Sequence, residues 1–205
     1  MEMSLTRKVA YILLTVTLLS SWFFYTPSTP LTDDEVDNYV QRIQAQQQDP
    51  GGRHDIDQLR AFLLEDDGKP FYTFNLYKFN GDALYNNELE QSVTGVEAYA
   101  KFSSVMVPLL LRNKSYPIFG SNWLGWSPNQ WDRIVIVRYA NRKAMAEIFA
   151  QDEFADASKH KWASIAKHDR FVVQATHLPE LSWLLLFTIA MLTVGLLLTA
   201  KRQST

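Results

Sequence analysis

Two uncharged hydrophobic segments, one near each end of the chain, constrain the possible folds of this sequence more than any other feature. They cover residues 9–25 and 181–200. A helix rises about 1.5 Å per residue, so about 20 apolar residues are needed to cross a hydrocarbon core of about 30 Å. The sequence therefore predicts a transmembrane helix at each end, the first of which is either an uncleaved anchor or a signal peptide.

The charges that flank these segments predict their orientation. Basic residues stand outside both segments, within residues 1–8 and 201–205, whereas the stretch that follows the first segment is acidic. Cytoplasmic flanks of membrane proteins carry an excess of Lys and Arg. We therefore expect an integral protein of the bacterial inner membrane, with the lipid bilayer as a partner, both termini cytoplasmic and the central domain periplasmic.

Charge balance and residue usage exclude several function classes. The 205 residues include 20 Lys and Arg against 22 Asp and Glu, so nucleic acid is not an expected partner. The absence of cysteine excludes a disulfide framework and a thiolate metal site. No two histidines stand three or four residues apart, as paired metal ligands on a helix would. We expect neither a metal nor another cofactor.

Residues 26–70 read as a linker and two membrane-proximal helices. Two prolines stiffen the start of this region, and Thr32 and Glu35 form a capping-box pattern that predicts the start of a helix. A second short helix is expected over residues 55–64, where apolar residues recur at helical spacing.

Residues 71–177 read as one α+β domain. Its expected elements alternate between strand and helix in the order strand, helix, strand, strand, helix, strand, at residues 71–79, 93–112, 116–126, 131–139, 141–167 and 171–176. This order is typical of the ferredoxin-like βαββαβ fold, an antiparallel four-stranded sheet with both helices on one face.

The strand at residues 131–139 adds a constraint on the other face of this sheet. Ile134 and Ile136 point to one face, while Val135 and Val137 point to the other. Both faces are apolar, so both should be covered. Helices cover one face, and the other should meet a second sheet or enclose a cavity.

Residues 71–176 resemble the dimeric α/β-barrel superfamily, and within it small proteins of unknown function whose first strand reads N-L-x-K-F. The resemblance is carried by short segments at residues 75–79, 97–101, 131–132, 138–139 and 152–154. It implies a homodimer in which two sheets pack face to face. The superfamily includes monooxygenases, haem-degrading enzymes and isomerases, so the fold alone does not name a reaction.

Alternation along the first strand predicts a candidate pocket. It places Asn75 and Tyr77 on one face and the more apolar Tyr72, Phe74 and Leu76 on the other, which we assign to the helices. The polar face could then line a cavity with aromatic walls. The candidate pocket residues are Asn75, Tyr77, Tyr99, Gln174, Thr176 and Trp126. The alternative is that these polar groups bond across a dimer interface and bind nothing.

Three functions are compatible with these residues. The first is a membrane-anchored, extracytoplasmic module that binds a small molecule, such as an aromatic ligand, or serves as an accessory module. The second is a cofactor-independent monooxygenase or isomerase that acts on a small aromatic or quinone-like substrate. The third is a structural partner of another membrane protein. The sequence contains no complete catalytic set, such as a G-x-S-x-G motif, so it leaves the catalytic residues unknown and enzymatic activity undecided.

Overall fold

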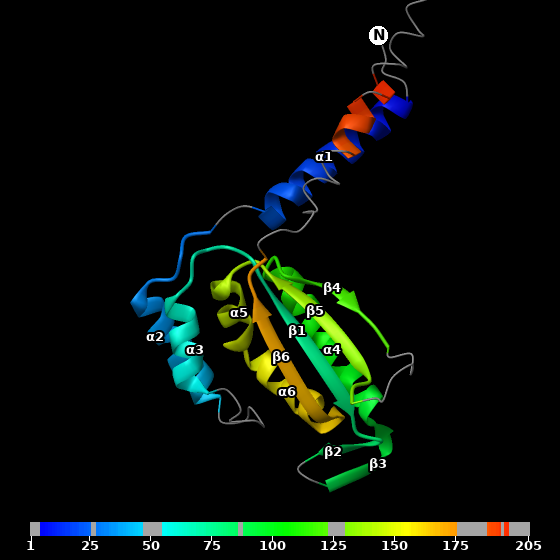
Figure 1. Cartoon of the computed structure of the whole chain (residues 1–205). Helices are drawn as coiled ribbons and strands as arrows, with labels where there is room; N and C mark the ends of the chain where they lie inside the picture. The colour runs from blue at the N-terminus through cyan, green and yellow to red at the C-terminus, as the bar shows by residue number, and fades with distance from the viewer. Residues whose placement is uncertain are drawn as a thin grey trace, which may run out of the picture. The chain divides into compact units, whose positions relative to one another are not determined.

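A computed structural model describes the chain at residues 5–25, 28–46, 55–85, 88–122, 130–175, 188–193 and 195–196. The chain divides into two compact units. One comprises Met1–Thr26 with Ala175–Thr205, and the other comprises Pro27–Gln174. The second unit holds the sheet and the helices that surround it (Figure 1).

The first unit contains the helix α1, Leu5–Tyr25. Within the described parts of the chain, no helix combines the length and the apolar character that crossing a bilayer requires. The sequence of α1 includes two basic residues and five Thr or Ser residues, which lower its apolar character. This finding overturns the predicted span at residues 9–25, the fold class with terminal transmembrane helices and the predicted integral membrane localisation. The predicted span at residues 181–200 falls largely outside the described residues.

The second unit is built on a four-stranded antiparallel sheet with the order β4-β5-β1-β6. Its strands are β1 (Phe71–Phe79), β4 (Tyr116–Gly120), β5 (Arg133–Tyr139) and β6 (Ile165–Val173). The helices α4 (Gly95–Arg112), α5 (Arg142–Phe149) and α6 (Asp152–Ser164) lie against one face of this sheet (Figure 1). A hairpin that sequence analysis missed, β2 (Asp82–Tyr85) and β3 (Glu88–Thr94), separates β1 from α4.

The longest helix of this unit, α4, begins at a capping box formed by Thr94 and Glu97. Thr94 accepts a hydrogen bond from the backbone N–H of Glu97, and the Glu97 carboxylate accepts one from the backbone N–H of Thr94 at 2.8 Å. This reciprocal pair satisfies two N–H groups that the first turn leaves without partners. Tyr99, Phe102 and Met106 then recur on one face and are buried in the core. The helix therefore presents an aromatic stripe to the sheet.

The face assignment made for β1 from sequence was wrong. The buried residues of the strand are Phe71, Thr73, Asn75 and Tyr77, with exposed fractions of 3%, 3%, 6% and 3%, and Tyr77 contacts Tyr99 of α4. The more apolar set that includes Phe74 faces away from the helices and is only partly buried. The polar side chains can face inward because they find hydrogen-bond partners there. The assignment from sequence compared only how apolar the two faces are, so it did not take these hydrogen bonds into account.

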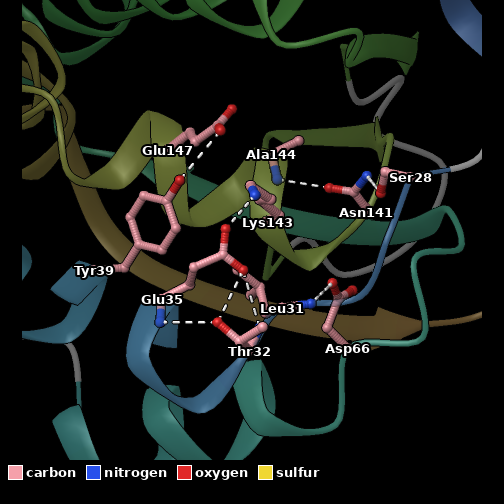
Figure 2. A network of polar contacts seen from close by, with 10 residues as sticks. All are labelled: Ser28, Leu31, Thr32, Glu35, Tyr39, Asp66, Asn141, Lys143, Ala144 and Glu147. Carbon is pink, nitrogen blue, oxygen red and sulfur yellow. Dashed lines mark hydrogen bonds and ion pairs between the residues drawn. The ribbon is translucent and has the colours of Figure 1, made fainter. Parts of the chain in front are cut away.

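Two further helices, α2 (Asp33–Ala45) and α3 (Ile56–Leu64), belong to the same unit as the sheet. Figure 2 shows how α2 joins α5: the Lys143 ammonium donates to the Glu35 carboxylate at 2.6 Å, and the Tyr39 hydroxyl donates to Glu147 at 3.2 Å. Hydrogen bonds from the Lys143 side chain and from the backbone N–H of Thr32 lower the pKa of Glu35 to about 2. The ion pair therefore stays charged well into the acidic range.

The face of the sheet opposite the helices carries an apolar row that crosses all four strands. Phe119, Ile136, Phe74 and Phe171 are register partners from β4, β5, β1 and β6. Phe119 and Phe171 at the two ends of this row are 49% and 53% exposed. Contiguous exposed apolar surface of this kind is typical of an interface. The expected homodimer stays a prediction, and this row is the surface on which a second copy would pack about a two-fold axis.

If the chain forms the predicted homodimer through this row, replacing Phe171 by aspartate is expected to raise its dissociation constant by about a hundredfold, because a charge would be buried at the interface. Sedimentation equilibrium measures the change. Val172→Asp is the matched control, because Val172 is the next residue along β6, is 44% exposed and points to the opposite face. A wild-type chain that is monomeric at all accessible concentrations would contradict the expected homodimer.

Candidate functional site

A cavity of about 590 Å³ lies between the sheet and the helices. Residues from β1, β5 and β6, from β4 and the two residues after it, and from α4, α5 and α6 line the cavity. Its aromatic walls come from Tyr77, Tyr99, Phe102, Tyr139, Phe149, Phe154 and Trp162. Its polar side chains include Thr73, Asn75, Ser103, Arg133, Ser158, Lys161, His168 and Arg170. The cavity therefore combines broad ring surfaces with a few polar groups.

Asn75 lies at the floor of the cavity with its amide orientation determined by its neighbours. The side-chain N–H₂ group donates to Thr73 Oγ1 at 3.1 Å and to the Val135 carbonyl at 3.3 Å. Because the amide nitrogen is committed to these acceptors, Oδ1 is the atom that faces Nε2 of His168, 3.4 Å away. Oδ1 can only accept, so Nε2 of His168 carries the hydrogen and Nδ1 carries the lone pair.

His168 is held among aromatic rings in a neutral state. Its ring stacks on Tyr77 with centroids 5.0 Å apart and meets Trp162 edge-on at 5.9 Å. Burial, followed by the positive charges of Lys161 and Arg170, lowers the pKa of His168 to about 3. Nδ1 makes no hydrogen bond to any described residue, and it is not sealed off from solvent. The imidazole thus keeps Nδ1 as a solvent-accessible acceptor, and the residue lines the cavity.

Three cations line the same cavity. Lys161 of α6 places its ammonium 5.8 Å from the Tyr77 ring centroid, and Arg133 of β5 places its guanidinium 5.5 Å from that of Tyr99. Arg170 of β6 is the register partner of Asn75 and shares its face of the sheet. Within the described parts of the chain, neither Arg133 nor Arg170 forms an ion pair. This arrangement favours an anion in the cavity.

The tyrosines of the cavity act as neutral groups. Burial, followed by interaction with Tyr99, raises the pKa of Tyr77 well above its ordinary value. Burial also raises the pKa of Tyr99 and of Tyr139. Their hydroxyls therefore keep their protons at physiological pH, and none of them adds a negative charge to oppose the cations.

The structure brings together some of the residues that sequence analysis selected. Asn75, Tyr77 and Tyr99 line the cavity, although the cavity lies on the helix side of the sheet rather than between two sheets. Gln174 is elsewhere, with its amide donating to Asp67 Oδ2 at 3.0 Å. Thr176 and Trp126 lie outside the described residues.

Sequence analysis missed His168, Lys161 and Arg133 as lining residues. The cause for His168 is a boundary error: the last strand was expected to begin at residue 171, whereas β6 begins at Ile165 and α6 ends at Ser164. Alternation from the correct start places His168 and Arg170 on one face, where they pair with Tyr77 and Asn75. The alternation of residues along β6 could have identified His168, but residues 165–167 were assigned to the preceding helix.

Comparison with solved structures supports the fold of this chain and carries no information on its function. The chain is similar to the RPA0582 protein of unknown function from Rhodopseudomonas palustris, with 23% identity, a TM-score of 0.51, and coverage of 60% of this chain and 92% of that chain. The structure of methylated RPA0582 gives 22% identity, the same TM-score, and coverage of 60% and 91%. No protein-family model and no curated protein matches the chain.

These findings overturn the family assignment made from sequence. The similar structures belong to proteins of unknown function, and no family model supports membership of the dimeric α/β-barrel superfamily flanked by transmembrane helices. Any functional conclusion therefore has to come from the cavity itself.

Proposed function

We propose that the Pro27–Gln174 unit binds a small planar aromatic molecule in the cavity between the sheet and the helices. The observation that carries the proposal is the cavity of about 590 Å³ with its aromatic lining. Small-molecule pockets fall in the range of about 300–1,000 Å³ and combine apolar walls with a few convergent polar groups. This cavity has both properties.

The shape of the walls supports a planar ligand. Tyr77 and Tyr99 contact each other at 5.0 Å, and Tyr99 contacts Phe102 at 5.8 Å, so consecutive rings form a continuous surface. Rings pack against other rings in offset-stacked or edge-on arrangements that add about 0.5–1.5 kcal/mol beyond the buried area. An aromatic ligand would extend this array of rings.

Two adjacent serines of α4 provide the test. Ser103 lines the cavity, whereas Ser104 is exposed to solvent. We expect isothermal titration calorimetry to detect binding of 1-naphthol, a neutral planar probe, to the wild-type chain. Ser103→Trp should weaken this binding by about tenfold or more, a loss of about 1.4 kcal/mol, because the indole occupies part of the cavity. Ser104→Trp should leave it unchanged.

The outcomes of this experiment separate the cavity from the open face of the sheet. Equal weakening by both serine variants, or loss of 1-naphthol binding in Phe171→Asp alone, would contradict a site in the cavity. Mass spectrometry of small molecules retained by the purified protein then identifies the natural ligand. A retained aromatic compound that Ser103→Trp loses and Ser104→Trp keeps is the expected result.

A further inference from the structure

We infer that the ligand of the cavity is an aromatic acid, whose carboxylate is bound by the guanidinium group of Arg170 and the hydroxyl group of Tyr139. This inference rests on the proposed function and specifies the chemical class of the ligand. It comes from two hydroxyl groups that are nearly buried without a partner, and from a cation that shares the cavity with them.

The hydroxyl group of Tyr139 is nearly buried but has no hydrogen-bond partner among the described residues. The residue is 5% exposed, yet its hydroxyl oxygen is not sealed off from solvent. Because Tyr139 lines the cavity and has so little other exposed surface, we place this hydroxyl at the cavity. Burial raises the pKa of Tyr139, so the hydroxyl keeps its proton and can donate it to an acceptor.

The hydroxyl group of Ser158 is in the same state. Ser158 belongs to α6, lines the cavity and is 2% exposed. Within the described parts of the chain its hydroxyl has no hydrogen-bond partner, although solvent can reach the oxygen. A nearly buried hydroxyl that stays without a partner costs free energy. The two hydroxyls therefore favour a ligand with polar atoms over a hydrocarbon.

Arg170 adds a positive charge on the same face of the sheet. It is the register partner of Asn75, which is buried toward the helices, so its side chain leaves the sheet on the cavity side. Arg170 is itself a lining residue. After burial, which is the largest cause, its charge contributes to the pKa shifts of three other lining residues, Tyr77, Tyr139 and His168. The guanidinium group therefore lies close enough to the Tyr139 hydroxyl for both to bind one carboxylate.

The charge of Arg170 has no counter-charge at the cavity. Its guanidinium group forms no ion pair or hydrogen bond with the residues that the structure describes. Among the described lining residues, Asp169 is the one acid, but it is the register partner of Leu76 on the opposite face. Asp169 Oδ1 accepts from the backbone N–H of Arg170 at 2.9 Å. A ligand carboxylate can therefore bind the guanidinium group without displacing a protein carboxylate.

The other two cations of the lining have contacts of their own. Arg133 donates to Asn122 Oδ1 at 2.8 Å, and Lys161 lies 4.7 Å from the Trp162 ring centroid. Both add to the positive potential of the cavity. The proposed carboxylate site does not depend on either of them.

The test compares two probes of similar shape and different charge, 2-naphthoate and 2-naphthamide. Isothermal titration calorimetry of the full chain should show that 2-naphthoate binds about tenfold more tightly. The physical reason is that hydrogen bonds between a guanidinium group and a carboxylate are charge-assisted, and these are about twice as strong as neutral ones.

Arg170→Met tests the guanidinium group, because it removes the charge and keeps an aliphatic side chain. It should reduce the affinity ratio of the two probes to about one and change the binding of neutral 1-naphthol by less than about twofold. Lys167→Met is the matched control. Lys167 is an exposed cation of the same strand that does not line the cavity, so its loss should preserve the ratio.

Tyr139→Phe tests the hydroxyl group, because it removes a single oxygen atom. It should weaken the binding of 2-naphthoate by about tenfold. Tyr72→Phe is the matched control, since Tyr72 lies on β1, outside the cavity lining, and alternates with the buried Thr73. It should leave the binding unchanged. Thermal unfolding monitored by circular dichroism confirms that each variant is folded.

The outcomes distinguish this inference from the proposed function. If 1-naphthol binds but 2-naphthoate binds no better than 2-naphthamide, the ligand class is wrong and the aromatic site stands. If Arg170→Met preserves the preference for 2-naphthoate, or Tyr139→Phe weakens its binding no more than Tyr72→Phe does, the proposed carboxylate site is wrong. If no aromatic probe binds the wild-type chain, both proposals fail.

Discussion

Replacing Asp66 by alanine is expected to lower the free energy of unfolding by about 2–4 kcal/mol, because a buried carboxylate with several hydrogen bonds is removed. Asp66 is 9% exposed. Its carboxylate accepts from the backbone N–H groups of Leu31 at 3.1 Å, Gly68 at 3.3 Å and Arg142 at 3.2 Å. Figure 2 shows the contact with Leu31 beside the network that joins α2 to α5.

The size of the expected loss follows from the three chain segments that meet at Asp66. Leu31 precedes α2, Gly68 belongs to the turn after α3, and Arg142 opens α5. Alanine would leave three backbone N–H groups without their acceptor, and a buried donor without a partner costs about 1–3 kcal/mol. Water can reach some of these groups after the change, so the total falls below the sum of three full penalties.

Equilibrium unfolding in urea measures this loss. Glu65→Ala is the matched control, because Glu65 is the preceding acidic residue and its side chain is 78% exposed, in a single 3.5 Å ion pair with Arg142. An exposed pair of this kind contributes about 0–1 kcal/mol. A loss in Asp66→Ala no larger than that in Glu65→Ala would show that the carboxylate is not what holds these segments together.

The second large effect is expected at Gly95, where α4 begins. A Cβ atom placed on Gly95 would lie 2.3 Å from the Asn80 carbonyl oxygen and 2.6 Å from that of Ser164. Both are backbone atoms, which cannot rotate away as the end of a side chain can. Gly95→Ala should therefore lower the free energy of unfolding by about 2–3 kcal/mol, since overpacked sites lose about 1–3 kcal/mol and this one must move backbone.

Gly95→Ala should also disturb the cavity, because its neighbours adjoin β1, α6 and β6, which contribute to the cavity lining. Asn80 follows β1, and Ser164 is the residue at which α6 gives way to β6. The backbone N–H of Asn80 donates to the Ser164 carbonyl at 2.9 Å, and the added methyl group would press on this contact. We expect weaker binding of 1-naphthol in the folded fraction, measured by calorimetry below the unfolding transition.

Gly81 provides the control for this substitution. It is also a glycine near the β1 end, but a Cβ atom there would meet nothing within 4 Å. Gly81→Ala should change the free energy of unfolding by less than about 0.5 kcal/mol, as most surface substitutions do. Equal effects of the two alanines would contradict the close approach at Gly95.

Features that depend on neighbours in the sequence were predicted well. The capping box at Thr32 and Glu35 lies where expected, with the Thr32 N–H donating to the Glu35 carboxylate at 3.0 Å. The strand at Phe71–Phe79 has the expected bounds. Capping and strand alternation are set by residues a few positions apart, so they can be read from the chain itself.

Features that depend on the environment of a segment were predicted poorly. The uncharged stretch at residues 9–25 indicated a membrane span, but α1 is not apolar enough over its length. The prediction of which side of the sheet Asn75 lies on was also wrong. A buried Asn is stable only when its partners are present, and those partners, Thr73, Val135 and His168, come from three different strands.

The sequence by itself determined the periodicity of β1, the cap of α2 and the presence of Asn75, Tyr77 and Tyr99 as polar groups among aromatic residues. Only the tertiary structure decided that these groups face the helices. It also placed His168 and Lys161 with them, because register between strands and packing of α6 bring together residues more than 60 positions apart in the chain. Hydrogen bonding and charge act through space, so the chemistry of the cavity exists only once the sheet has formed.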